Sequence, residues 1–282
     1  INRKKFNLFD RVRLDVNGDG QYADDEELVS PDAKCGSVVE DTFGQKYYSA
    51  EGATEVKVEE AGPVRVCVAA KGLHKAADGK GYSRGMYNYE IRMHFYAGKD
   101  LVRLDAVLSA SGAEPNGSPV FKDHSLLTHL NIEPAEIPNA EAKHKEKVAL
   151  YRIYGQSPVF GELRQGQSAM IYQDSNGAET WKVNTGLDGV SGVELSSFRG
   201  YQISLKDAAG AKVLSSGDHA RGVVSIGGNK GGVVVVPRYF WQQFPKAIEV
   251  GHDGIARIGL FPREYRTPHW LPDGGGSGTE LW

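Results

Sequence analysis

The residues whose types and spacing best suit chemistry lie near the start of the chain, in segment 15–26. This segment matches the calcium-loop pattern D-x-[DN]-x-[DN]-G-x5-E at every specified position. A hard cation prefers a cage made only of oxygen atoms, and the glycine at the sixth place permits the sharp turn that such a cage needs. The predicted ligands of a Ca²⁺ ion are the side chains of Asp15, Asn17, Asp19 and Glu26 and the backbone carbonyl of Gln21.

The alternative interpretation of this segment is an acidic, glycine-containing surface turn that binds nothing. The flanking residues favour a strand before the loop and at most a short helix at 24–30, so the paired helices of an EF-hand are not expected. We therefore expect a single calcium loop whose ion stiffens a connection.

A second set of chemically suited residues follows a run of four valines at 233–236. Because apolar and polar residues do not alternate there, the run predicts a strand buried on both faces, and the strand must end at Pro237. Aromatic and basic residues crowd the next positions: Arg238, Tyr239, Phe240, Trp241, Phe244 and Lys246. One interpretation is a hydrophobic plug that closes the core. The other is a ligand-binding ledge, where rings stack on sugars while Arg and Gln bind their polar edges.

The strand expected at 255–261 repeats this arrangement near the end of the chain. It also stops at a proline, Pro262, and the residues that follow are again aromatic and basic: Arg263, Tyr265, Arg266, His269 and Trp270. If the two strands are antiparallel neighbours, both clusters meet at a shared rim.

Alternation of apolar and polar residues recurs along the chain, for example at 54–59, 64–68 and 87–95, with the period of half-buried strands. In the last of these, His94 falls on the polar face and is expected to be exposed. Turn-forming residues separate such segments about every dozen residues, and no stretch shows sustained helical periodicity. We expect an all-β protein, a large antiparallel β-sandwich with long loops and little helix. Segment 134–147 alone has helical composition, and we interpret it as a solvated excursion.

The length, net charge and apolar content of the chain exclude several classes of function. The chain of 282 residues can bury a sizeable core, and its net charge of −3 gives no reason to expect nucleic acid as a partner. No apolar run approaches the roughly 20 residues that span a bilayer, so we expect no membrane partner either. The two cysteines, Cys35 and Cys67, lack metal-ligand spacing and leave open either one disulfide or two buried thiols.

Six segments together resemble one known family, the exo-rhamnogalacturonan lyase-like (YetA-like) polysaccharide lyases of bacteria and fungi. The segments are EAGPVR at 60–65, FYAGK at 95–99, IYQDS at 171–175 with Trp181, FRGY at 198–201, YFWQQFPK at 239–246 and GLFP at 259–262. Members of that family consist of a β-barrel, a central β-sandwich and an α/α toroid. The resemblance implies three parts: 1–50 as a barrel remnant carrying the calcium loop, 51–270 as the sandwich, and 271–282 as a linker to a C-terminal helical domain. We accordingly expect the chain to be a piece of a longer protein.

The resemblance also implies a reaction, β-elimination. A polysaccharide lyase removes the proton α to a uronate carboxylate and expels the sugar oxygen at C4, and a cation must offset the second negative charge that develops. For this reaction the sequence offers Arg263 or Arg266 for the carboxylate, and Tyr239, Tyr265 or His269 for proton transfer. The residues implied to bind the sugar are Arg238, Trp241, Lys246, Arg266 and Trp270.

Two functions from different classes remain. The first is the central sandwich of a lyase, secreted or periplasmic, which forms one wall of a cleft for an acidic polysaccharide or oligosaccharide together with the helical domain. The second is a non-catalytic, calcium-stabilised sandwich that binds carbohydrate or neighbouring domains. A sugar epimerase or mutarotase is a third possibility, on fold analogy alone.

Overall fold

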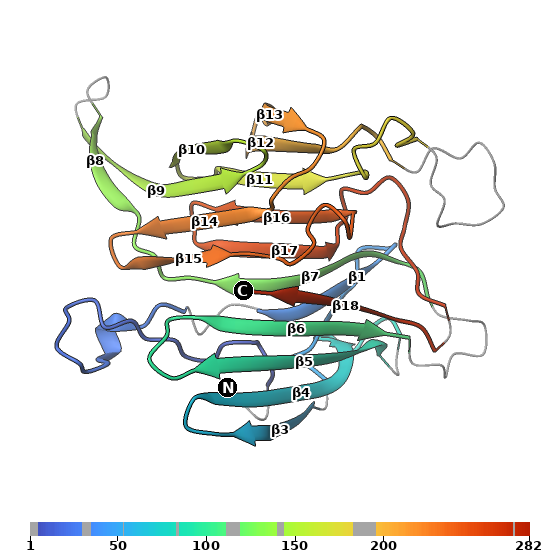
Figure 1. Ribbon diagram of the computed structural model, residues 1–282, viewed down its shortest axis with the longest axis horizontal. Helices are drawn as coiled ribbons and strands as arrows, with labels where there is room; N and C mark the ends of the chain where they lie inside the picture. The colour runs from blue at the N-terminus through green and yellow to red at the C-terminus, as the bar shows by residue number, and fades with distance from the viewer. Residues whose placement is uncertain are drawn as a thin grey trace.

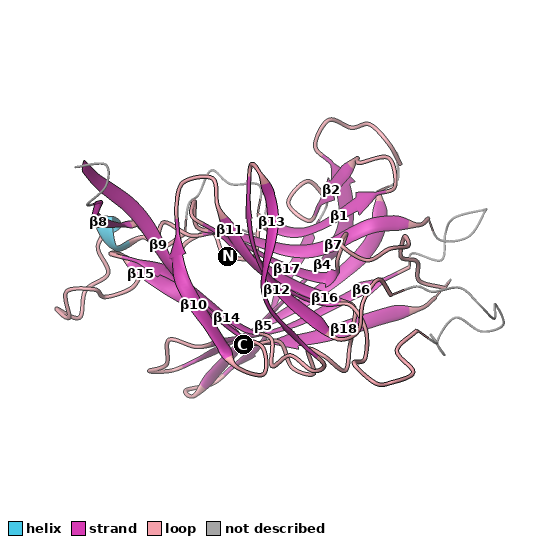
Figure 2. Cartoon of the chain, turned by 90° about the horizontal axis from the view of Figure 1, so that it is seen from above, coloured by secondary structure: helices cyan, strands magenta, loops and turns pink. Residues whose placement is uncertain are grey.

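Among the described residues, the regular elements of the computed structural model are almost all strands (Figures 1 and 2). One helical turn, η1 (Asp24–Glu26), is the exception among the regular elements. None of the described residues forms a helix with the length and apolar character that crossing a bilayer requires. The all-β class predicted from the alternation is therefore confirmed. The described residues are 5–29, 35–52, 54–82, 85–110, 119–139, 144–182, 196–272 and 274–282.

Thirteen strands form the larger sheet, in the order β13-β12-β11-β16-β17-β7-β1-β2-β4-β5-β6-β18, with β3 paired to β4. Each pairing between neighbours is antiparallel. The bounds of these strands are β1 Gly36–Asp41, β2 Lys46–Tyr48, β3 Thr54–Ala61, β4 Arg65–Ala76, β5 Met86–Tyr96, β6 Val102–Ser109, β7 Phe121–His129, β11 Ser168–Gln173, β12 Tyr201–Asp207, β13 Gly210–Gly217, β16 Lys246–Gly251, β17 Ile255–Phe261 and β18 Gly276–Leu281.

Five strands form the smaller sheet, in the order β10-β9-β14-β15, with β8 paired to β9. These pairings are antiparallel as well. The bounds are β8 Ala135–Asn139, β9 His144–Tyr154, β10 Pro158–Leu163, β14 Val223–Gly228 and β15 Gly231–Val235.

The larger sheet folds back on itself at β4. Most of β4 pairs with β5, but its end pairs with β2 beyond a register shift between Leu73 and His74. Met93 of β5 and Leu126 of β7 belong to one core cluster, although β1, β2 and β4 separate their strands within the sheet. The two parts of the sheet therefore face each other across the core, as in a sandwich.

The smaller sheet extends the second layer of the sandwich. Pro237 and Leu281 form a bridge just beyond β15, and Val236 and Trp282 exchange backbone hydrogen bonds of 2.8 and 3.0 Å. The second layer thus runs from β9, β14 and β15 into β18, β6 and β5, and Figure 1 shows these strands in that succession.

The alternation in the sequence decides which face each side chain takes. Ile248 and Val250 of β16, and Ile258 of β17, join the core cluster, whereas Glu249 and Arg257 point to the opposite face. Removing one such aliphatic side chain from water contributes about 1.5–3 kcal/mol, which fixes the register of the strands.

Three expectations about local structure are wrong. The valine run is an edge strand of the smaller sheet, so Val234 is exposed while Val235 is buried. The described residues of segment 134–147 form no helix despite the helical composition of the segment, because β8 pairs there with the start of β9. His94 is buried, because its Nε2 bonds to Asp105 (2.9 Å) on the neighbouring strand and Cys67 lies beside it.

The segment assigned to a barrel remnant contains two strands of the sandwich. β1 lies between β2 and β7 in the larger sheet, so residues 36–48 pack with the rest of the molecule. The origin of the preceding residues in a barrel stays a prediction. Cys35 and Cys67 are both buried and free, which decides between the two alternatives for the cysteines.

Candidate functional site

The predicted calcium loop forms a compact turn that leads into η1. Asp15 lies at its centre: its Oδ1 accepts hydrogen bonds from the backbone N–H groups of Gly18 (2.8 Å) and Asp19 (3.1 Å), and its Oδ2 accepts one from Gly20 (2.9 Å). Glu26 closes the loop and accepts hydrogen bonds from two further backbone N–H groups at 2.9 and 3.0 Å. The turn is therefore well bonded without an ion.

The remaining predicted ligands bond in the same way. The side chain of Asn17 accepts a hydrogen bond from the N–H of Asp19 (2.9 Å), and the side chain of Asp19 accepts one from Gln21 (2.7 Å). Across the described residues, no group of three or more His, Cys, Asp or Glu side chains is arranged to hold a metal ion. The side chains of the loop bond to its own backbone N–H groups, and calcium binding stays a prediction.

The outer face of the larger sheet carries a groove with a cavity volume of about 1370 Å³. Strands β1, β7, β11, β16 and β17 form its floor, and connections at 131–134, 165–167, 229–230 and 252–253 form its sides. Carboxylates, amides, histidines and lysines dominate the lining, and its described residues include no Phe, Tyr or Trp. A ligand in this groove would be held by hydrogen bonds and charges, not by ring stacking.

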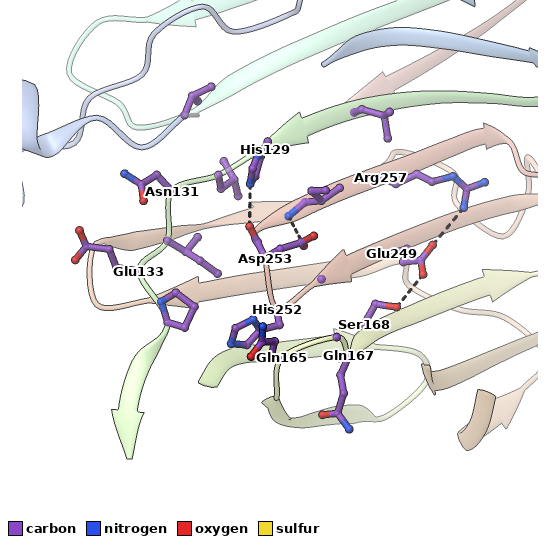
Figure 3. Close-up of a pocket in the computed structure, with 18 of the residues that line it drawn as sticks. His129, Asn131, Glu133, Gln165, Gln167, Ser168, Glu249, His252, Asp253 and Arg257 are labelled. Atoms are coloured by element: carbon purple, nitrogen blue, oxygen red, sulfur yellow. Dashed lines mark hydrogen bonds and ion pairs between the residues drawn. The ribbon is translucent and has the colours of Figure 1, made fainter. Parts of the chain in front are cut away.

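Figure 3 shows the polar side chains of the groove. His129 bonds to the carbonyl oxygen of Asp253 (3.0 Å), while Ser168 donates to Glu249 (2.9 Å), which in turn lies 3.7 Å from Arg257. These groups come from four different strands and one turn, so the sheet, and no single loop, positions them.

Arg257 is the centre of a buried ion network in the groove. Its side chain is only 5% exposed. It pairs with Asp123, binds Glu264 through both terminal nitrogens at 3.1 Å, and donates from Nε to Ser125 (3.0 Å). Three carboxylates, with Glu249, therefore surround one guanidinium.

The network sets the charge state of its members. Burial alone would lower the pKa of Arg257, but the negative charges of Asp123 and Glu264 outweigh burial and raise that pKa above its ordinary value. For Glu249 burial favours the neutral form, yet Lys206, the hydrogen bond from Ser168 and Arg257 together hold its pKa below the ordinary value. Both shifts favour the charged forms of Arg257 and Glu249, and the guanidinium of Arg257 is already paired with carboxylates.

Arg263 offers the groove a more accessible cation. Its side chain is 41% exposed, and its ion pairs with Glu249 and Glu264 are long, 3.8 Å each. Its backbone N–H donates to Asp123 (3.0 Å), which ties the residue to the buried network. Arg263 is therefore anchored through its backbone while its guanidinium faces solvent.

The other predicted residues that follow β17 are placed differently. Tyr265 and His269 are 6% and 7% exposed, and their rings stack 5.5 Å apart. His269 Nε2 bonds to the carbonyl oxygen of Pro262 (3.0 Å), and burial lowers its pKa to about 4. Neither residue lines the groove, so their burial does not favour the predicted proton transfer. Arg266 and Trp270 are both exposed.

The predicted ledge after Pro237 is divided among three environments. Arg238 and Tyr239 line a smaller pocket beside β6 and β18. The ring of Trp241 lies 4.1 Å from that of His219. Lys246 is buried and donates to the carbonyl oxygen of Leu260 (2.7 Å), and burial lowers its pKa to about 7. The ledge is therefore neither a simple plug nor one continuous surface.

The family comparison agrees with this architecture. Residues 7–114 and 195–257 match the family described as PcRGLX-like protein central beta sandwich domain, and these segments cover more than half of the chain. The chain belongs to this family. No curated protein matches it.

Only part of the candidate site of this PcRGLX-like sandwich lies within the matched residues. The calcium loop, Arg238, Tyr239 and Arg257 lie within the matched residues. Strands β7 to β11 and everything from residue 258 onward lie outside them, and so does Arg263. The groove therefore combines strands of the matched sandwich with strands beyond it.

Sequence reasoning missed the ion network of the PcRGLX-like sandwich. One signal was present: Glu249 and Arg257 occupy polar places of two alternating strands joined by a short turn, and they face each other across β16 and β17. Asp123 had no such signal, because it reaches Arg257 from a strand 134 residues away.

Proposed function

We propose that this chain is the central β-sandwich of a polysaccharide lyase that acts on uronate-containing polysaccharide by β-elimination, as a YetA-like member of the family. In this proposal the groove binds a stretch of the polymer, and a C-terminal helical domain of the same protein supplies the rest of the cleft. Secretion or a periplasmic location follows from the substrate, which is a polymer outside the cytoplasm.

The observation that carries the proposal is the groove with Arg263 at its buried ion network. The amides and carboxylates of the lining suit the many hydroxyl groups of a sugar chain. Amides can donate a hydrogen bond to a hydroxyl or accept one from it, and carboxylates can accept one. The guanidinium of Arg263 suits a uronate carboxylate, which it can bind through two parallel hydrogen bonds. Arg257 is excluded from this role because its own carboxylates already neutralise it.

In the elimination, Arg263 would hold the carboxylate next to the carbon that loses its proton. Binding the carboxylate lowers the cost of the negative charge that develops on it, and stabilisation of this kind is usually the largest contribution to such catalysis. Tyr239 lies on another pocket and Tyr265 and His269 are buried. The proton acceptor is accordingly proposed to come from the helical domain.

The second candidate is a non-catalytic sandwich that binds or positions carbohydrate and is stabilised by calcium at loop 15–26. The burial of Tyr265 and His269 favours it, since it leaves the groove without either predicted base. Both candidates share the groove and differ only in whether a product forms.

The test uses the chain as it exists, with polygalacturonate and rhamnogalacturonan as probes. Absorbance of the unsaturated product reports elimination, and affinity electrophoresis reports binding. We expect Arg263→Ala to weaken binding of both polymers at least about tenfold, as loss of a charge-assisted pair does. The matched control is Arg221→Ala, an exposed arginine that lines neither pocket. Product formation by the chain joined to its C-terminal helical domain supports the lyase, binding without product in that joined protein supports the module, and equal binding by Arg263→Ala and Arg221→Ala contradicts the role of the groove.

A further inference from the structure

A second, smaller pocket of about 270 Å³ lies on the face of the sandwich opposite the groove. Its floor is the outer side of β6 and β18. Leu104 and Leu281 of these strands point into the core, whereas Asp105 and Glu280 point outward into the pocket. The turn that follows β15 forms its rim with Arg238, Tyr239 and Gln243.

Arg238 and Tyr239 form a preorganised pair at this rim. The guanidinium carbon lies 4.8 Å from the centre of the tyrosine ring, and Nη2 donates to the tyrosine Oη (3.0 Å). Nη1 donates to Glu280 (3.1 Å), which holds the guanidinium edge over the pocket. These two bonds use two of the five N–H donors of an arginine, so donors remain for a ligand.

Tyr239 has a backbone conformation that points to a role for its side chain. Its φ is +57°, in the left-handed region that glycine adopts without strain, yet the position carries a large ring that is 51% exposed. The turn is closed by a hydrogen bond from the N–H of Gln243 to its carbonyl oxygen (2.9 Å). Since neither strain nor exposure of the ring stabilises the fold, an observed outlier of this kind supports a binding function.

The acidic side chains beside the pocket each have a hydrogen-bonding partner. Glu280 accepts from Arg238 and from the indole Nε1 of Trp282 (2.9 Å), and Asp105 is paired with Arg103. An exposed pair such as Arg238 with Glu280 contributes little to stability. A ligand carboxylate can therefore share or replace Glu280 at Arg238 at small cost.

From this geometry we propose that the pocket binds one acidic sugar residue, separately from the groove. The sugar ring lies against the face of Tyr239, its carboxylate binds Arg238, and its hydroxyls reach the polar groups of Gln243 and Thr279. The volume suits a single sugar residue. This inference rests on the proposed function only for the class of ligand, an acidic sugar. The domain would then contact polysaccharide on two opposite faces.

The test uses methyl α-D-galacturonide as the acidic probe and methyl α-D-galactoside as its neutral counterpart, with saturation-transfer NMR and calorimetry on the full chain. We expect the acidic probe to bind and Arg238→Gln to weaken it about tenfold or more. Tyr239→Gly should weaken binding similarly without lowering the melting temperature, because glycine accepts the positive φ. The matched control is Arg152→Gln, which removes another exposed arginine lying over a ring, that of Phe160 at 6.0 Å, where no described pocket is formed.

The groove variant separates this inference from the proposed function. Arg263→Ala should reduce polymer binding but leave the affinity for the acidic monosaccharide unchanged. Failure of the lyase proposal would show as no product from the chain joined to its helical domain, while the monosaccharide still binds through Arg238. Any one of four results overturns the inference. The first is no binding of the acidic probe at about 10 mM, and the second is an unchanged affinity in both pocket variants. The third is a loss of monosaccharide binding only in Arg263→Ala, and the fourth is equal affinity for the neutral probe.

Discussion

Arg257 shows how a buried charge on the outer face of a sheet is kept stable. Its guanidinium is shielded from water, and Asp123 and Glu264 are held against it. Removing one partner from such a buried network leaves the others without compensation, which costs about 3–5 kcal/mol. We expect Arg257→Met to lower the free energy of unfolding by this amount, measured by urea denaturation at neutral pH.

The control for this prediction is Arg263→Met in the same groove. Its ion pairs of 3.8 Å are long and its side chain is accessible, so the expected loss is about 1 kcal/mol or less. Equal losses in the two variants would contradict the distinction between a structural Arg257 and an available Arg263.

At the residue scale, the sequence indicated which residues could do chemistry but not which side chains contact one another. It predicted Arg263 as a cation for a carboxylate, and the structure places this side chain in a groove. It also placed His269 and Tyr265 beside it, and these side chains turn inward, because a short segment after a proline gives no periodicity from which to predict direction. Burial of rings is the usual outcome when a core lies within reach.

At the element scale, the calcium loop joins the first residues of the chain to η1. Its oxygens are bonded to its own backbone, so an ion has to compete with those hydrogen bonds. If the motif works as predicted, Ca²⁺ stabilises the folded chain by mass action, about 2.7 kcal/mol at a hundredfold excess over Kd. We expect the melting temperature to rise with added Ca²⁺ and to fall again with chelator.

Glu26→Gln is the matched variant for the loop. It removes one charge, so it should abolish the response to Ca²⁺. Because Glu26 accepts a backbone hydrogen bond on each oxygen and an amide NH₂ cannot accept, it should also lower the melting temperature of the ion-free chain. A wild-type chain that melts at the same temperature with Ca²⁺ and with chelator would sink the calcium prediction.

The elements themselves were predictable where alternation was clean and not where it was absent. β5 follows the predicted alternation except at His94, and β17 has the bounds expected from the proline that ends it. The valine run was misassigned because a β-branched run without alternation suits a central strand as well as an edge strand, and only the position of β15 at the edge of its sheet decides. The helical composition of segment 134–147 gives no helix in its described residues, because pairing with a neighbouring strand overrides the weak helical preference of Glu and Lys.

At the scale of the whole molecule, the folding back of β4 creates a buried polar cluster where the layers meet. Ser37 Oγ lies 2.9 Å from His74 Nε2 and 2.9 Å from His124 Nε2, and Lys246 and His269 complete the cluster. These residues come from separate strands and the final connection, so no local pattern in the sequence could have predicted their meeting.

This cluster makes the stability of the sandwich depend on pH. Burial lowers the pKa of His74 and of His269 to about 4, and burial with the neighbouring charges lowers that of His124 well below 6.5. The unfolded chain, with histidine pKa values near 6.5, binds more protons between pH 6.5 and 4, so stability falls as pH falls through this window. Each histidine contributes at most about 1.4 kcal/mol per pH unit there. Lys246, at about 7 against 10.5 when unfolded, extends the rise of stability with pH above 7.

The measurement is urea denaturation at half-unit steps from pH 4.5 to 7.5. We expect the free energy of unfolding to rise with pH. His74→Gln should reduce the slope below pH 6.5, because the unfolded chain then has one fewer histidine that binds a proton while its folded counterpart does not. Arg221→Gln, an exposed arginine that stays protonated throughout, should keep the wild-type slope. A flat profile, or a slope that His74→Gln leaves unchanged, would mean that the layers part around the cluster and admit water while the sandwich is still folded. The junction at β4 would then be a mobile seam and not the closed core described above.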